Sequence, residues 1–141
     1  MRILVVGRGA REHVICWLIR KQHPDWEIYC APGSPGIAQV AEVLSQFKLD
    51  IPFSRLPELW CEIRNLRAWA VEQRIDLVIV GPEDPLAAGI VDAFTGVGLY
   101  VFGPTKAAAQ LETDKGFAKG LMSRIGVPTA PYELLKPPSP A

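Results

Sequence analysis

Apolar residues follow two different spacings along this chain. Short continuous runs are typical of strands buried on both faces of a sheet, whereas recurrence every three or four positions is typical of amphipathic helices. The runs predict strands at residues 2–6, 27–30, 47–50, 76–80 and 99–102. Because helical stretches separate these runs, the pattern predicts an α/β fold: an open five-stranded parallel sheet, Rossmann-like, with helices on both faces.

Two of the predicted helices are defined mainly by their apolar positions. The first covers residues 11–21, and its apolar side is formed by Val14, Ile15, Trp17 and Leu18. The second is a long amphipathic helix within residues 56–70, where leucine, tryptophan, isoleucine and alanine recur at helical spacing. Both are expected to cover a face of the sheet.

The later helices are defined by their ends. Asp84 is expected to cap a helix with Pro85 at its first position, where the missing N–H of proline is harmless. Thr105 and Asp114 are expected to cap two further helices, and the second of these stops before Gly126.

The chain is expected to hold one domain and a short extension. Residues 1–126 are predicted to form an N-terminal α/β domain. Residues 127–141 are predicted to be a linker or the start of a further domain, because the last six residues include three prolines and cannot add a core element.

Composition narrows the possible partners. Fifteen basic residues balance fifteen acidic ones, so no general field attracts nucleic acid or an anionic membrane. The three cysteines are scattered without metal-ligand spacing, and no apolar run approaches the roughly 20 residues that span a bilayer. A cytoplasmic protein without nucleic-acid or membrane partners is expected.

The first predicted strand runs into a glycine-rich turn and then a helix. Gly7, Gly9 and Ala10 form this turn. Glycines allow close backbone approach, and free N–H groups at a helix start favour an anion. Arg11 follows where its guanidinium could reach a bound phosphate, although it could equally be a solvated arginine. The turn alone therefore leaves two alternatives, a phosphate site and a tight turn that binds nothing.

The dinucleotide fingerprint is incomplete in this turn. Glu12 stands at its third glycine position, and residues 29–31 supply no acid at the end of the second strand for the ribose hydroxyls. NAD binding is therefore disfavoured. An acid in the first turn of a helix complements the helix dipole, so Glu12 is expected to be structural.

Four loops are expected to meet at the carboxyl edge of the sheet, where ligands of such folds bind. They cover residues 7–10, 31–36, 81–85 and 103–106. Glu83 and Lys106 are the ionisable groups considered as ligand contacts in these loops. A carboxylate suits a hydroxyl or amine and a lysine suits a phosphate, but Glu83 could also simply help to cap its helix.

Four segments together resemble one family, the phosphoribosylamine–glycine ligases, also called glycinamide ribonucleotide synthetases. Residues 7–13 resemble the family's opening G-x-G-[GA]-R-E-H motif. Residues 31–33 resemble the start of its A-P-G-N turn, residues 80–92 its V-G-P-E-x-P-L segment, and residues 102–112 its F-G-P-T segment. Their order and spacing make the resemblance far more specific than a glycine turn alone.

The resemblance implies a pre-ATP-grasp N-terminal domain of a ligase that joins glycine to 5-phosphoribosylamine in purine biosynthesis, with ATP and magnesium or manganese. It implies substrate binding at Gly7, Gly9, Ala10, Arg11, Pro32, Gly33, Gly81, Pro82, Glu83 and Lys106. Lys115 resembles the lysine of ATP-grasp enzymes that contacts the ATP phosphates. No catalytic residue and no metal ligand is assigned to this chain.

This chain also departs from the family. Ser34 replaces the asparagine of the A-P-G-N turn, and residues 38–60 follow the family only loosely. The family continues well beyond Tyr132 into an ATP-grasp body with a lid and acidic magnesium ligands. The chain alone is therefore expected to be inactive and to need that body in cis or in trans. A stand-alone sugar-phosphate-binding module and an inactive remnant remain as alternatives.

Overall fold

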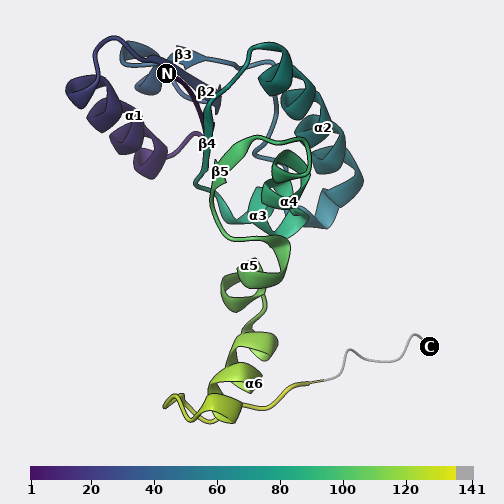
Figure 1. Cartoon of the computed structure of the whole chain (residues 1–141). Helices are drawn as coiled ribbons and strands as arrows, with labels where there is room; N and C mark the ends of the chain where they lie inside the picture. Colours follow the sequence, from purple (N-terminus) through teal and green to yellow (C-terminus); the bar gives the residue numbers. More distant parts are fainter. Residues whose placement is uncertain (136–141) are drawn as a thin grey trace. The chain divides into compact units, whose positions relative to one another are not determined.

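Parallel strands form a single five-stranded sheet in the computed structural model of this chain, which describes residues 1–135 (Figure 1). The strands are β1 (Arg2–Gly7), β2 (Glu27–Pro32), β3 (Glu42–Val43), β4 (Leu77–Val80) and β5 (Tyr100–Phe102). Their order is β3-β2-β1-β4-β5, and every neighbouring pair is parallel. The predicted fold class is confirmed, and the carboxyl ends of the strands meet at one edge.

Helices cover both faces of this sheet. They are α1 (Ala10–Gln22), α2 (Leu56–Glu72), α3 (Glu83–Ala88), α4 (Ile90–Thr95), α5 (Lys106–Thr113) and α6 (Lys115–Ile125), with short 3-10 turns at Ile37–Gln39 and Phe53–Arg55. Leu4 and Val6 of β1 pack in a core with residues of α2, α3 and α4. The alternate residues Ile3 and Val5 pack in a second core with Cys16 of α1. This alternation places the two groups of helices on opposite faces.

The described chain divides into two compact units, one formed by Met1–Ala109 and one that begins at Gln110. The first contains the whole sheet, and the second contains α6. The domain boundary predicted after Gly126 stays a prediction. The proline-rich residues 136–141, predicted to be linker-like, lie outside the described residues.

The predicted third strand at residues 47–50 is wrong. Phe47 and Leu49 are buried in the core of the first unit, but the paired strand is the earlier β3. The backbone N–H of Lys48 donates to the Glu62 carboxylate over 3.0 Å rather than to a neighbouring strand. Alternating apolar residues in an extended segment report burial of one side, and they do not require strand pairing.

The predicted apolar side of α1 is wrong for three of its four residues, and only Ile15 packs against the second core. Val14, Trp17 and Leu18 are exposed, and Cys16 and Glu12 are the buried residues of this helix. Burial of Glu12 beneath the glycine turn, described below, fixes the rotation of α1 about its axis. Three large apolar side chains are consequently left on its outer side.

The helix expected from Asp84 is divided into α3 and α4. Pro82 precedes the first helical residue of α3, so the N-cap lies two residues before Asp84. Gly89 has φ of +93°, a left-handed conformation that ends α3 and precedes α4. Leu86 of α3 and Phe94 of α4 both lie in the core.

The other two predicted caps are confirmed. The Thr105 hydroxyl accepts a hydrogen bond from the backbone N–H of Ala108 over 3.3 Å. The Asp114 carboxylate accepts one from the N–H of Phe117 over 2.9 Å, and Gly126 ends α6 with φ of +74°.

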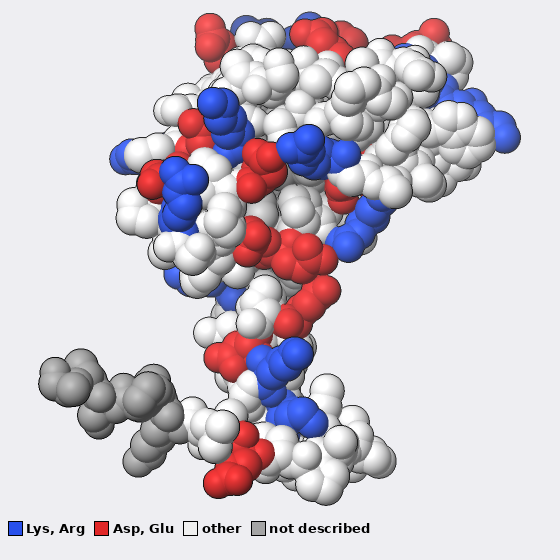
Figure 2. Space-filling model, turned by 180° about the vertical axis from the view of Figure 1, so that it is seen from behind, with Lys and Arg blue, Asp and Glu red and all other residues white. Residues whose placement is uncertain are grey.

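Charged side chains of both signs lie beside one another on the face of the chain shown in Figure 2. Within residues 1–135, no helix combines the length and the apolar character needed to cross a bilayer.

Candidate functional site

A cavity of about 330 Å³ opens at the carboxyl ends of β1, β2 and β4. Its volume is within the range typical of small-molecule sites. It is lined by Gly7, Arg8, Gly9, Ala10, Arg11, Glu12, Pro32, Leu49, Asp50, Pro82 and Glu83. Segments far apart in the sequence therefore supply its walls, and all of them belong to the first unit.

The glycine turn forms one wall of this cavity. Gly7 has φ of +134°, a conformation that favours glycine, and its carbonyl accepts a hydrogen bond from the N–H of Gly33 over 3.1 Å. Helix α1 begins immediately afterwards, at Ala10. The positive end of the helix dipole therefore lies at the cavity, where it favours an anion.

The Glu12 side chain packs against this turn. Its side chain is buried, and its Oε2 accepts a hydrogen bond from the N–H of Gly9 over 2.7 Å. A Cβ added to Gly81 would lie 2.0 Å from Glu12 Oε1, and one added to Gly7 would lie 2.5 Å from Glu12 Cγ. The carboxyl group therefore occupies the space that glycine leaves in two separate turns. Glu12 was expected to be structural through the helix dipole, and this packing role was not predicted.

Arg11 connects α1 to the turn that follows β4. Its Nη1 donates to the Gly81 carbonyl over 2.5 Å, and its Nη2 lies 3.1 Å from Glu83 Oε1. The pKa of the Glu83 carboxyl group is lowered, mainly by a hydrogen bond from the backbone N–H of Glu83 and next by the Arg11 guanidinium. Glu83 therefore presents an ionised carboxylate at the cavity at neutral pH.

A second ion pair, which the sequence did not predict, lies at the same cavity. Arg8 Nη1 is 2.5 Å from Asp50 Oδ2. Both side chains are about half exposed, at 59% and 45%. Asp50 could have been predicted from the expected strand at residues 47–50, because the last residue of that strand would lie at the carboxyl edge of the sheet. For Arg8, the sequence offers no indication of a role in the site other than its position between two glycines.

Comparison with known proteins identifies the family of this chain. A family described as "Phosphoribosylglycinamide synthetase, N domain" matches residues 1–112. The chain belongs to this family.

Relatives of the N domain are long enzymes. A phosphoribosylamine–glycine ligase of Agrobacterium fabrum is 42% identical over 141 residues, which are the whole of this chain and 30% of that relative. The trifunctional purine biosynthetic protein adenosine-3 of Drosophila melanogaster is 43% identical over 134 residues, 94% of this chain and 9% of that protein. This chain thus spans less than a third of the length of these relatives.

A solved structure supports the fold. The crystal structure of phosphoribosylamine–glycine ligase from Thermotoga maritima matches with a TM-score of 0.58 and 24% identity. The match covers 94% of this chain and 27% of that one. At this identity the match shows the fold of the N domain and nothing further.

The structure brings most of the predicted substrate-binding positions of the N domain to the cavity. Those in its lining are Gly7, Gly9, Ala10, Arg11, Pro32, Pro82 and Glu83. Gly33 and Gly81 are outside the lining, but each makes a hydrogen bond to a lining residue, Gly33 to Gly7 and Gly81 to Arg11. Their roles in binding stay predictions.

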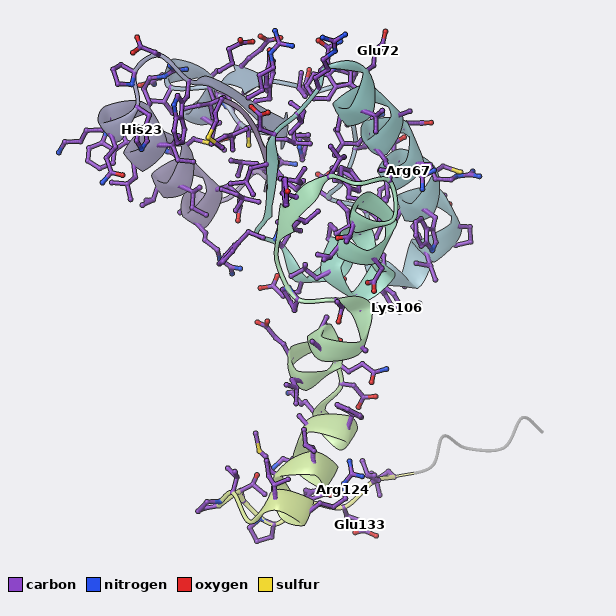
Figure 3. All side chains as sticks on the ribbon, in the orientation of Figure 1. His23, Arg67, Glu72, Lys106, Arg124 and Glu133 are labelled. Atoms are coloured by element: carbon purple, nitrogen blue, oxygen red, sulfur yellow. The ribbon has the colours of Figure 1, made fainter. Side chains whose placement is uncertain are left out.

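Two predicted lysines lie elsewhere. Lys106 is outside the cavity lining, at the start of α5, where its N–H donates to the Asp92 carboxylate over 2.7 Å and its side chain lies against Gly89 (Figure 3). Lys115 is the first residue of α6, in the second unit. Their ligand-binding roles also remain predictions.

No metal centre is formed by the part of the N domain that the structure describes. Residues 1–135 contain no group of three or more histidine, cysteine, aspartate or glutamate side chains that could hold a metal ion. Cys16 and Cys30 are buried, and the Cys30 thiol donates to the Gly7 carbonyl over 3.3 Å.

Proposed function

We propose that this chain is the substrate-binding part of an ATP-dependent ligase that joins glycine to 5-phosphoribosylamine in purine biosynthesis. The observation that carries the proposal is the cavity of this N-domain family member, which combines a glycine turn, a helix start and an ionised carboxylate. Its ligand would be the phosphoribosylamine, and its partner would be an ATP-grasp body, in cis or in trans.

The chemistry of phosphoribosylamine matches these groups. Its phosphate would bind at the glycine turn, where the helix dipole favours negative charge. Its ribose hydroxyls and amine are hydrogen-bond donors, and the Glu83 carboxylate can accept from them. Arg11 already contacts Glu83, so it would hold that carboxylate in place while the ligand binds.

Catalysis would require groups that this chain does not supply. ATP, with magnesium or manganese, would be bound chiefly by the ATP-grasp body, and Lys115 would reach the ATP phosphates from α6. Phosphoryl transfer depends on positioned phosphates and metal ions. We therefore expect the chain alone to have no ligase activity. It would act in the cytoplasm, together with the ATP-grasp body.

Binding tests the proposal first. Ribose 5-phosphate, a stable relative of the substrate, is expected to raise the Tm of the chain at millimolar concentration, because it binds the folded state. Ribose, which lacks the phosphate, should raise it much less. Arg124→Gln on α6 is a matched control that should respond as the unaltered chain does. Equal shifts with ribose and ribose 5-phosphate, or no shift with either, would contradict a phosphate-binding cavity.

A stand-alone sugar-phosphate-binding module is the second candidate. It is favoured by one observation, that every residue lining the cavity belongs to the first unit. Addition of the separately produced ATP-grasp body of the Agrobacterium relative separates the two candidates. Glycinamide ribonucleotide formed only by the mixture supports the ligase, whereas binding of ribose 5-phosphate without activity in the mixture supports the module.

A further inference from the structure

The cavity contains two arginine–carboxylate pairs that are held differently. Arg11 contacts both a main-chain carbonyl, that of Gly81, and the Glu83 carboxylate. Among the described residues, the charged partner of Arg8 is Asp50. Releasing Arg11 would remove one donor from the Gly81 carbonyl and one from the Glu83 carboxylate, whereas releasing Arg8 would break one exposed ion pair.

We propose that Arg8 is the arginine that binds the ligand's phosphate in this cavity, and that Asp50 is its competing partner when the cavity is empty. The ligand class rests on the proposed function above. Asp50 then acts against the ligand: each phosphate that binds must displace this carboxylate from the Arg8 guanidinium.

The position of Arg8 supports this role. It lies within the glycine turn, between Gly7 and Gly9, and its side chain lines the cavity beside the start of α1. A guanidinium binds phosphate through two parallel hydrogen bonds, and a phosphate carries more charge and more acceptor oxygens than a carboxylate. A phosphate in the turn would therefore compete well for the Arg8 side chain.

The position of Asp50 supports the competition. The preceding residue, Leu49, is buried in the core, so the backbone next to Asp50 is anchored at the cavity. The Asp50 side chain is half exposed, and ion pairs as exposed as this one stabilise proteins very little. A bond so easily broken is poorly suited to hold two loops together and well suited to exchange.

The arrangement makes opposite predictions for the two members of the pair. In the full 141-residue chain, Arg8→Gln is expected to weaken binding of ribose 5-phosphate and of inorganic phosphate about tenfold, because a charge-assisted hydrogen bond is lost. Asp50→Asn is expected to tighten binding of both ligands about two- to fivefold, because the competitor is removed. Isothermal titration calorimetry measures the dissociation constants of both ligands for the unaltered chain and for each variant.

The double variant shows whether Asp50 acts through Arg8. If it does, Arg8→Gln with Asp50→Asn binds as weakly as Arg8→Gln alone. If Asp50 repels the ligand directly, the double variant binds more tightly than Arg8→Gln, and the competition is wrong. Arg55→Gln, which removes one half of an exposed ion pair with Glu58 on α2, is the matched control and should leave both affinities unchanged. Circular dichroism melting establishes that each variant is folded.

Other outcomes separate this inference from the proposed function. Wild-type affinity in Arg8→Gln, or weaker binding in Asp50→Asn, would overturn the inference while leaving the sugar-phosphate site in place. Binding of inorganic phosphate that depends on Arg8, with no tighter binding of ribose 5-phosphate, would support Arg8 and contradict the proposed substrate. A chain that binds neither ligand would refute both.

Discussion

Glu12 shows how one residue can decide the identity of others at a distance in the sequence. It stands where the dinucleotide fingerprint has a third glycine, and its buried carboxyl group fills the space beneath the first and fourth strand ends. Gly7 and Gly81 are both restricted by this side chain. The requirement for glycine at position 81 therefore follows from a residue 69 positions earlier (81 minus 12).

Gly81→Ala is expected to lower the free energy of unfolding by about 1–3 kcal/mol, the usual range for overpacking a well-filled site. The added methyl group would meet Glu12, which can move only by giving up its hydrogen bond to the N–H of Gly9. Urea unfolding followed by circular dichroism measures the loss.

Gly120→Ala on α6 is the control, because a Cβ there lies 3.8 Å from its nearest neighbour, the Tyr132 hydroxyl. That variant should be at least as stable as the unaltered chain. Combining Gly81→Ala with Glu12→Ala should cost less than the sum of the two single changes, since the clash is removed. Additive losses would mean that Glu12 does not determine the need for glycine.

At the scale of elements, the junction between α3 and α4 depends on one left-handed residue. Gly89 ends α3 and precedes α4 with φ of +93°. Both short helices pack against the core through Leu86 and Phe94.

Gly89→Ala is expected to lower the free energy of unfolding by about 1–2 kcal/mol, the penalty of placing an L side chain in the left-handed region. Gly89→Asn should lose less, because asparagine tolerates this conformation. Chemical denaturation compares the two variants directly. Equal losses would attribute the effect to the space around the residue rather than to its backbone conformation.

The sequence predicted those elements in which an apolar pattern coincides with clear signals for both ends of the element. β4 and α2 each combine an uninterrupted apolar pattern with clear boundaries, and the structure places them almost where expected. The rotation of α1 could not be predicted, because its buried side includes the carboxylate Glu12. Hydrophobic spacing contains no information about a buried acid.

The candidate site was predicted where it lies at strand ends and missed where it depends on a loop without regular structure. Pro82 and Glu83 follow β4 directly, so the topology of a parallel sheet placed them at the cavity. Asp50 reaches the same cavity from an irregular segment. Its contact with Arg8 depends on how the buried residues Phe47 and Leu49 pack, which a linear pattern does not specify.

For the whole molecule, the division into two units separates the candidate cavity from the end of the described chain. All the residues that line the cavity lie between residues 7 and 83, and both cores of buried residues end by Ala109. None of the described residues 110–135 belongs to the lining or to these cores. The first unit therefore contains the packing that the cavity needs.

A shortened chain that ends at Thr113 is expected to fold and to keep the ribose 5-phosphate response of the full chain. Ending at Thr113 preserves α5 and the buried Ala109. Differential scanning fluorimetry with and without the ligand measures both properties. A shortened chain that melts cooperatively but has lost the ligand response would place part of the binding site beyond Thr113.

The contact between Arg11 and Glu83 spans 72 residues of sequence, and that separation bears on when the cavity can form. β1 lies between β2 and β4 in the sheet. β2 follows β1 closely along the chain, whereas β4 comes much later in the sequence. During synthesis, β1, α1 and β2 can associate while β4 is still unmade, and the cavity then lacks a wall. Closing so long a loop is also slow in folding from the full chain. Ligand binding therefore reports the addition of β4 to the sheet, and it cannot assist the earliest steps of folding.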